Sequence, residues 1–167
     1  RLFPGSSPGA YLMTFFYAAE QDGEAFLDSS AFTTVHPVIP DGAIHWANSL
    51  AHELLHFWIG QRIRGEDYAT SQWIGEGFTE YLANLTLVRE GIVDELTFRR
   101  KAEKHVGNYL YYQWSSAFEA PILEAGERKG YNRFGVYDGG WVVALCLDAR
   151  LREGSAQFDT PAAESPP

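Results

Sequence analysis

The sequence predicts an α+β fold that is mainly helical, in which short N-terminal strands precede a pair of core helices and further helices. Two observations lead to this expectation. Near the N-terminus, short apolar runs are bounded by turn-forming residues, a pattern typical of strands. From residue 43 onward, apolar residues recur at helical spacing in longer segments, two of which are followed by glycine.

The N-terminal part contains two predicted strands with a turn between them. Residues 11–19 form an aromatic-rich run, and residues 30–35 form a second short run. Residues 21–24 are polar and include a glycine, so they are predicted to form the turn. Two prolines and a glycine between residues 37 and 42 then break the chain before the first helix.

The remaining sequence predicts four helices. The first is apolar on nearly all sides, which is expected of a helix that passes through the core. Asp41 precedes this helix as a candidate N-cap, and Gly60 and Gly91 follow the first two helices, where glycine often ends a helix. The predicted helices span residues 43–59, 71–89, 94–111 and 137–152.

The length of the chain, 167 residues, is sufficient for one domain with a hydrophobic core. We predict that residues 1–153 form this domain. Residues 154–167, rich in Pro, Ala, Ser and Glu, are predicted to form a disordered tail. Because the sequence begins at Arg1 rather than at a methionine, we expect it to be a fragment or a processed form.

The charge balance argues against two classes of partner. The chain carries 22 Asp and Glu residues against 13 Lys and Arg residues, a formal net charge of −9. Nucleic acids and anionic membrane surfaces are therefore not expected as partners, because both attract basic proteins. No apolar run approaches the length of a membrane span. A single cysteine excludes an internal disulfide and indicates no particular compartment.

An H-E-x-x-H motif lies in the first predicted helix and consists of His52, Glu53 and His56. On a helix, residues four apart lie on the same face, so the two imidazoles could bind one metal ion. Zinc suits such a site, because imidazole is a good zinc ligand and an open coordination position activates water. Glu53 is adjacent to His52 and could reach that water without binding the metal itself.

A catalytic zinc site needs a third protein ligand. The best candidate is Glu76, which lies on the second predicted helix, 20 residues after His56, between two glycines that leave room around it. Glu66 and Asp67 in the preceding loop are alternatives.

Glu80 follows Glu76 by one helical turn on the same face. Its carboxylate could accept a hydrogen bond from the outer N–H group of His52 or His56 and fix the orientation of that ring. The other interpretation, an exposed charge on a helix surface, is equally compatible with the sequence.

Three stretches of the sequence resemble the gluzincin clan of zinc peptidases. The sequence is most similar to the glycyl aminopeptidase family within that clan and more distantly to the aminopeptidase N family. The stretches are residues 52–64 (H-E-L-L-H-F-W-I-G-Q-R-I-R), 73–81 (W-I-G-E-G-F-T-E-Y) and 136–148 (V-Y-D-G-G-W-V-V-A-L-C-L-D).

The resemblance implies a thermolysin-like catalytic domain with one zinc ion, a peptide as substrate and hydrolysis by a metal-activated water. The flanking domains of the family have no counterpart in this sequence, so we expect them elsewhere in the full-length chain.

The resemblance also implies a role for individual residues. His52, His56 and Glu76 would bind zinc, and Glu53 would move a proton from the zinc-bound water to the leaving amine. Tyr137 would donate its hydroxyl group to the oxyanion of the tetrahedral intermediate. The basic residue that the family usually has two positions after this tyrosine is replaced by Gly139.

Aminopeptidases of these families bind the amino group of the substrate with a glutamate on a strand before the zinc helix. Alignment by resemblance places Ala25 at that position, and Glu24 is one residue away. Glu24 is therefore the candidate for binding the amino group, although a shift of one residue on a strand points to the opposite face.

Three functions are compatible with the sequence. The leading hypothesis is a zinc-dependent peptidase, expected to be an aminopeptidase. The second is a catalytically inactive, peptidase-like module that binds peptides or a protein partner, which the intact Glu53 and ligand set argue against. The third is a purely structural zinc site, which would need a fourth protein ligand that the sequence does not place.

Overall fold

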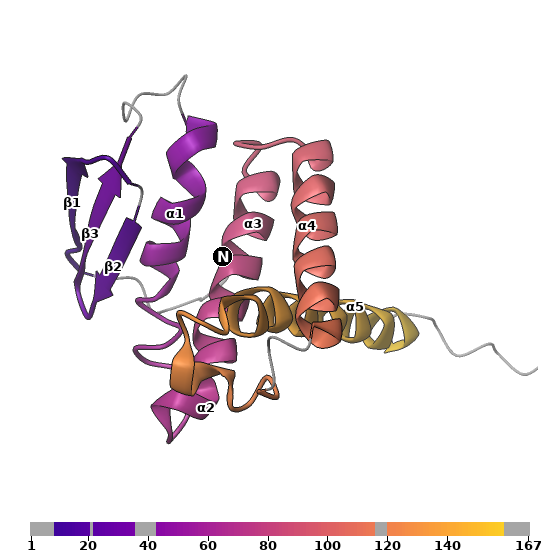
Figure 1. The fold of residues 1–167 in the computed structure, drawn as a ribbon. Helices are drawn as coiled ribbons and strands as arrows, with labels where there is room; N and C mark the ends of the chain where they lie inside the picture. The colour runs from indigo at the N-terminus through magenta and orange to yellow at the C-terminus, as the bar shows by residue number, and fades with distance from the viewer. Residues whose placement is uncertain (1–8, 21, 36–42, 116–119, 159–167) are drawn as a thin grey trace, which may run out of the picture.

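A computed structural model describes residues 9–20, 22–35, 43–115 and 120–158 of the chain. A small sheet lies beside α1, and the remaining helices lie on the other side of α1 (Figure 1). The prediction of a mainly helical α+β fold is therefore confirmed. Within the described ranges, no helix has the length and apolar character needed to cross a bilayer.

The sheet contains three strands in the order β1-β3-β2. Strands β1 (Leu12–Tyr17) and β3 (Ser29–Thr34) are parallel, and β2 (Asp22–Phe26) is antiparallel to β3. The turn predicted at residues 21–24 is wrong, because residues 22–24 belong to β2. The sequence of β2, D-G-E-A-F, gives no strand signal of its own, and this strand is defined by its pairing with β3.

The inner face of the sheet packs on α1 (Ala43–Leu55). Side chains of β3 alternate between partly and fully buried, and the buried set is Ser30, Phe32 and Thr34. This alternation is the period of two that a strand with one covered face requires.

Helix α1 ends at Leu55, earlier than the predicted end at residue 59. The chain continues in turns, in which the His56 amide donates to the His52 carbonyl at 3.3 Å and the Ile59 amide to the Leu55 carbonyl at 3.0 Å. Gly60 follows with a φ of +88°, a conformation that favours glycine. The candidate N-cap Asp41 lies outside the described residues.

The second predicted helix is one helical stretch of three parts. They are α2 (Tyr68–Gln72), the π-helical segment η2 (Trp73–Phe78) and α3 (Thr79–Arg89). The stretch begins three residues before the predicted residue 71, because the Asp67 carboxylate accepts a hydrogen bond from the Thr70 amide at 2.8 Å and caps α2.

The C-terminal part contains two long helices, α4 (Glu95–Trp114) and α5 (Gly140–Phe158). Before α5 lie a short 3₁₀ segment, η3 (Ala125–Arg128), and a second π-helical segment, η4 (Phe134–Gly139). Helix α5 continues past the predicted end at residue 152. The first residues of the predicted tail, 154–158, are therefore helical, and the rest of that tail lies outside the described residues.

Segment η2 packs closely on the start of α5, directly after η4, where Gly77 faces Gly140. A Cβ atom on Gly77 would overlap the backbone of Gly140 and lie 2.7 Å from the Trp141 nitrogen. Beside this crossing, the fully buried Trp141 packs edge-on against Tyr81, with ring centroids 5.3 Å apart. The crossing brings η2 and η4 together, which are far apart in the sequence, and each carries a candidate site residue.

Gly77→Ala should destabilise the protein by about 1–3 kcal/mol, because the added methyl group has no space at the crossing. Gly107→Ala in α4 is the matched control, because a Cβ atom at Gly107 meets nothing within 4 Å. The control should stabilise the protein by about 0.5–1 kcal/mol, the usual gain from replacing a helical glycine. Urea unfolding of both variants measures these changes, and equal stabilities would contradict the close crossing.

Candidate metal centre

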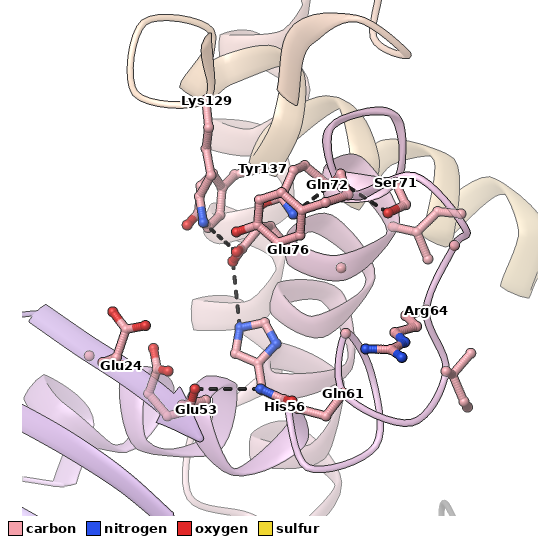
Figure 2. A pocket seen from close by; sticks show the side chains of 18 of the residues that line it. Glu24, Glu53, His56, Gln61, Arg64, Ser71, Gln72, Glu76, Lys129 and Tyr137 are labelled. Atoms are coloured by element: carbon pink, nitrogen blue, oxygen red, sulfur yellow. Dashed lines mark hydrogen bonds and ion pairs between the residues drawn. The ribbon is translucent and has the colours of Figure 1, made fainter. Parts of the chain in front are cut away.

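A cavity of about 1080 Å³ lies between the edge strand β2, the end of α1 and the helical segments η2 and η4. Figure 2 shows Glu53 and His56 near one wall of the cavity, and Glu76, Tyr137 and Lys129 near the opposite wall. Residues of the H-E-x-x-H motif, of η2 and of η4 therefore line a single cavity.

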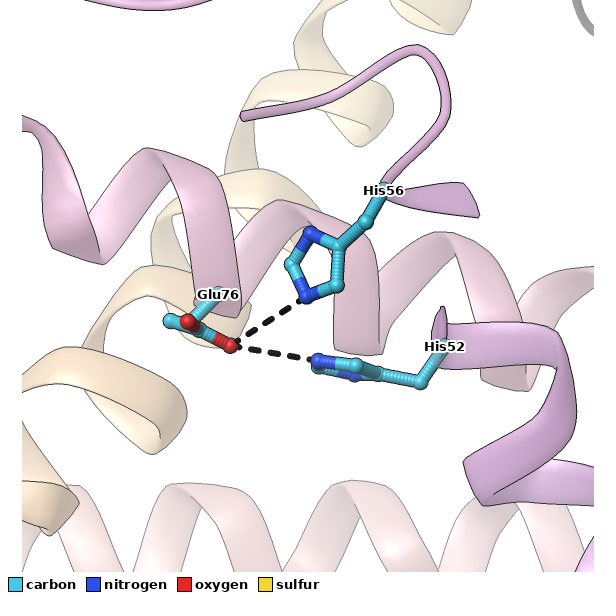
Figure 3. Close-up of side chains that lie close together, drawn as sticks. All are labelled: His52, His56 and Glu76. Carbon is cyan, nitrogen blue, oxygen red and sulfur yellow. Dashed lines mark hydrogen bonds and ion pairs between the residues drawn. The ribbon is translucent and has the colours of Figure 1, made fainter. Parts of the chain in front are cut away.

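Three potential metal ligands, His52, His56 and Glu76, converge beside this cavity, and the last two line it (Figure 3). The Oε2 atom of Glu76 lies 3.2 Å from Nε2 of His52 and 3.5 Å from Nε2 of His56. One ligand atom of each residue lies within 4.8 Å of the other two. His52 and Glu76 are buried and His56 is partly buried, so these atoms are largely withdrawn from bulk solvent.

Both imidazoles are oriented by hydrogen bonds on their far side. The Nδ1–H group of His52 donates to Oε2 of Glu80 at 2.9 Å, and that of His56 donates to the Ile59 carbonyl at 3.1 Å. These bonds leave the Nε2 atom of each ring directed at Glu76. Histidine ligands of metal ions commonly have such partners, which fix the ring and its tautomer.

Glu80 is held by α1 and α3 rather than exposed. Its other oxygen accepts hydrogen bonds from the side-chain amides of Asn48 at 2.9 Å and Asn84 at 3.0 Å. Its side chain is only 15% exposed. Of the two interpretations that the sequence left open, the arrangement favours the one in which Glu80 orients His52.

The charges of these groups are strongly coupled. Burial lowers the pKa of the His52 imidazole, but hydrogen bonds with Glu76 and Glu80 outweigh burial and raise this pKa to about 9. Burial raises the pKa of the Glu76 carboxyl group, but hydrogen bonds with His52 and His56 outweigh burial and hold this pKa well below its usual range. Two imidazoles surrounded by carboxylates form an environment that attracts a cation.

The donor set fits a catalytic zinc ion. Two imidazole nitrogens and one carboxylate oxygen are the ligands that such sites use, and a fourth position is left for water or substrate. Within the part of the chain that the structure describes, no fourth His, Cys, Asp or Glu joins the group. A closed structural site would need such a ligand.

Glu53 lies beside this group and lines the cavity. Its side chain packs against the backbone of Gly23, where a Cβ atom would lie 2.5 Å from Oε1 of Glu53. A glycine within strand β2 therefore permits the close approach of the strand to the carboxylate. Burial raises the pKa of Glu53, and the charges of His52 and His56 act in the opposite direction.

Tyr137 reaches the cavity from η4. Its ring stacks on His52 with centroids 6.1 Å apart and an interplanar angle of 26°. Burial, followed by the charge of Glu76, raises the pKa of its hydroxyl group. The next residue, Asp138, accepts hydrogen bonds from His105 at 2.7 Å and Asn108 at 3.1 Å, so α4 holds the segment that carries the tyrosine.

Lys129 lines the cavity and Arg133 lies beside the Tyr137 ring, although no sequence motif indicated either residue. The Lys129 ammonium group donates to Oε1 of Glu76 at 2.5 Å and lies 5.5 Å from the centroid of the Tyr137 ring. The guanidinium carbon of Arg133 lies 4.7 Å from the same centroid. Both residues precede the tyrosine in a glycine-rich connection without a motif, so only the folded chain reveals them.

The structure places the remaining candidates as follows. Glu24 is an exposed residue of β2 that lines the cavity near Glu53. It pairs with Ala31 and therefore points to the face of the sheet opposite the buried Phe32. Of the alternative third ligands, Glu66 lines the cavity but does not join the metal-binding group, and the Asp67 carboxylate caps α2.

Comparison with known proteins agrees with these motifs. Residues 45–120 match the sequence model of the M61 glycyl aminopeptidase family. The matched range includes the H-E-x-x-H motif, Glu76 and Glu80, whereas Tyr137 lies beyond it. A search of curated proteins gives no match.

A solved structure of an aminopeptidase N family protein from Idiomarina loihiensis is similar to this fold, with a TM-score of 0.67 and 20% sequence identity. The similarity covers 87% of this chain and 30% of that protein, so the chain spans less than a third of the length of its structural neighbour. The predicted resemblance to glycyl aminopeptidases is therefore confirmed over residues 45–120, and the chain shares its fold with an aminopeptidase N family protein.

Proposed function

We propose that this chain is the catalytic part of a zinc-dependent peptidase that acts as an aminopeptidase. One observation carries the proposal, namely the convergence of His52, His56 and Glu76 within 4.8 Å of one another beside the cavity that Glu53 lines. The match to a peptidase family over the same residues supports it. The arrangement would be thermolysin-like, with the H-E-x-x-H helix beside the sheet and the third ligand on the next helix.

In this proposal the three ligands hold the metal ion, and Glu53 transfers the proton. A zinc ion held by the ligands would polarise the substrate carbonyl and lower the pKa of a coordinated water. Glu53 then accepts the proton of the attacking water and transfers it to the leaving amine. Burial suits Glu53 to this task, because the raised pKa of its carboxyl group makes it a stronger base than an exposed glutamate.

Tyr137 stabilises the negative charge that develops on the carbonyl oxygen. Its hydroxyl group is protonated at neutral pH, as in any tyrosine, and burial raises its pKa further, so the group can donate a hydrogen bond to the oxyanion. The stacking on His52 and the anchoring of Asp138 by α4 hold the tyrosine beside the metal ligands. Preorganised donors of this kind need no rearrangement during the reaction.

Glu53→Gln should reduce turnover by about 10²–10⁴-fold, because the amide cannot accept the proton. Bound zinc should remain at the wild-type amount, because Glu53 is not among the metal-binding group. The measurements are peptide hydrolysis and metal content by atomic absorption, with Glu95→Gln on the surface of α4 as the control. Wild-type turnover in the Glu53 variant, or turnover that survives removal of zinc by a chelator, would refute the proposal.

Glu80→Gln should weaken zinc binding by about 10- to 100-fold, the usual cost of losing the partner that orients a histidine ligand. The reason is that the His52 Nδ1–H group loses a charged acceptor at 2.9 Å. Competition with a chromophoric chelator measures the affinity, and Glu95→Gln again serves as the control. An unchanged affinity would show that Glu80 does not support the metal ligands.

Glu24 provides the aminopeptidase specificity in this proposal, because its carboxylate can pair with a free amino terminus at the cavity. Glu24→Gln should raise KM for peptides with a free amino group by about two- to fivefold, the size expected for an exposed ion pair. Asp22→Asn, on the same strand but outside the cavity lining, is the control. Equal hydrolysis of N-acetylated peptides by the wild type would instead indicate an endopeptidase.

A further inference from the structure

The two oxygens of Glu76 have different partners. Oε2 faces the imidazoles of His52 and His56 at 3.2 and 3.5 Å. Oε1 accepts a hydrogen bond from the ammonium group of Lys129 at 2.5 Å, as Figure 2 shows from the side of the cavity. The carboxylate is therefore shared between the metal-binding group and a fixed positive charge.

Lys129 is positioned by the segment that it follows. Segment η3 packs tightly on α2, where a Cβ atom on Gly126 would overlap the Ala69 carbonyl and lie 2.8 Å from Cβ of Gln72. The Lys129 side chain is 35% exposed and lines the cavity. Its ammonium group lies between Glu76 and the ring of Tyr137. This lysine is held at the site rather than free on the surface.

A carboxylate can bind a metal ion through one oxygen or through both. If both oxygens of Glu76 were available, the second could fill the position that a catalytic zinc site must leave open. A cation hydrogen-bonded to Oε1 engages that oxygen and leaves Oε2 directed at the histidines. The same cation also repels a metal ion held at Oε2, so its presence weakens metal binding.

We propose that Lys129 is a positioning residue that restricts Glu76 to one oxygen toward the metal and so keeps a coordination position open. This inference rests on the proposed function of the site. It assigns to Lys129 an effect that a purely structural residue would not have, since removal of the lysine should strengthen metal binding while it weakens catalysis.

Replacement of zinc by cobalt(II) makes the coordination visible, because four-coordinate cobalt absorbs visible light more strongly than five- or six-coordinate cobalt. Lys129→Met should weaken this absorption, because Oε1 of Glu76 becomes free to bind the metal. The affinity for cobalt and for zinc should rise by about three- to tenfold, since a nearby positive charge is lost. Peptide hydrolysis should show kcat reduced by about 10- to 100-fold.

Two further variants make the test specific. Lys129→Arg retains a charged donor and should restore the wild-type cobalt spectrum. Arg133→Met removes a positive charge beside the Tyr137 ring, and within the described residues no contact joins Arg133 to Glu76. This variant should also leave the spectrum unchanged.

A Lys129→Met variant with the wild-type spectrum, or with weaker metal binding, would overturn the inference. A wild-type protein that binds cobalt but cleaves no peptide would overturn the proposed function, whereas the spectra of the variants would still decide the role of Lys129. A wild-type protein that binds no metal would overturn both.

Discussion

The hydrogen bond between His52 and Glu80 is the interaction on which the site depends. It joins α1 to α3, and the amides of Asn48 and Asn84 bind the same carboxylate from these two helices. Because Glu76 lies one turn before Glu80, this contact also fixes the separation between the two histidines and the Glu76 carboxylate. The buried carboxylate is tolerated because each of its oxygens has hydrogen-bond partners.

Local spacing was sufficient to select His52, His56 and Glu76, the three residues that the structure brings together. The pairing of His52 with His56 follows from helix geometry, and it holds even though α1 ends at Leu55, because a backbone hydrogen bond continues the turn. Glu76 could be selected because it lies on a helix, whereas the alternatives Glu66 and Asp67 lie in a loop. Features that depend on residue spacing within one helix could therefore be predicted from the sequence alone.

Features that arise from contacts between segments far apart in the sequence could not be predicted from the sequence alone. Strand β2 has no strand pattern of its own and forms through its pairing with β3. The tight crossing of Gly77 and Gly140 brings together segments more than 60 residues apart. Lys129 belongs to the same class, because no local pattern distinguishes it from any other surface lysine. The packing of η3 on α2 brings Lys129, the residue that follows η3, to its ion pair with Glu76.

Both segments that carry key side chains of the site are π-helical, η2 with Glu76 and η4 with Tyr137. A π-helical turn contains an extra residue, so the helix on one side of it is rotated by about 100° relative to an uninterrupted α-helix. Removal of a single residue from either segment would restore regular hydrogen bonding and swing the side chain away from the cavity. Each irregularity therefore sets the rotation of its helix about the helix axis, and with it the direction of the side chain at the cavity.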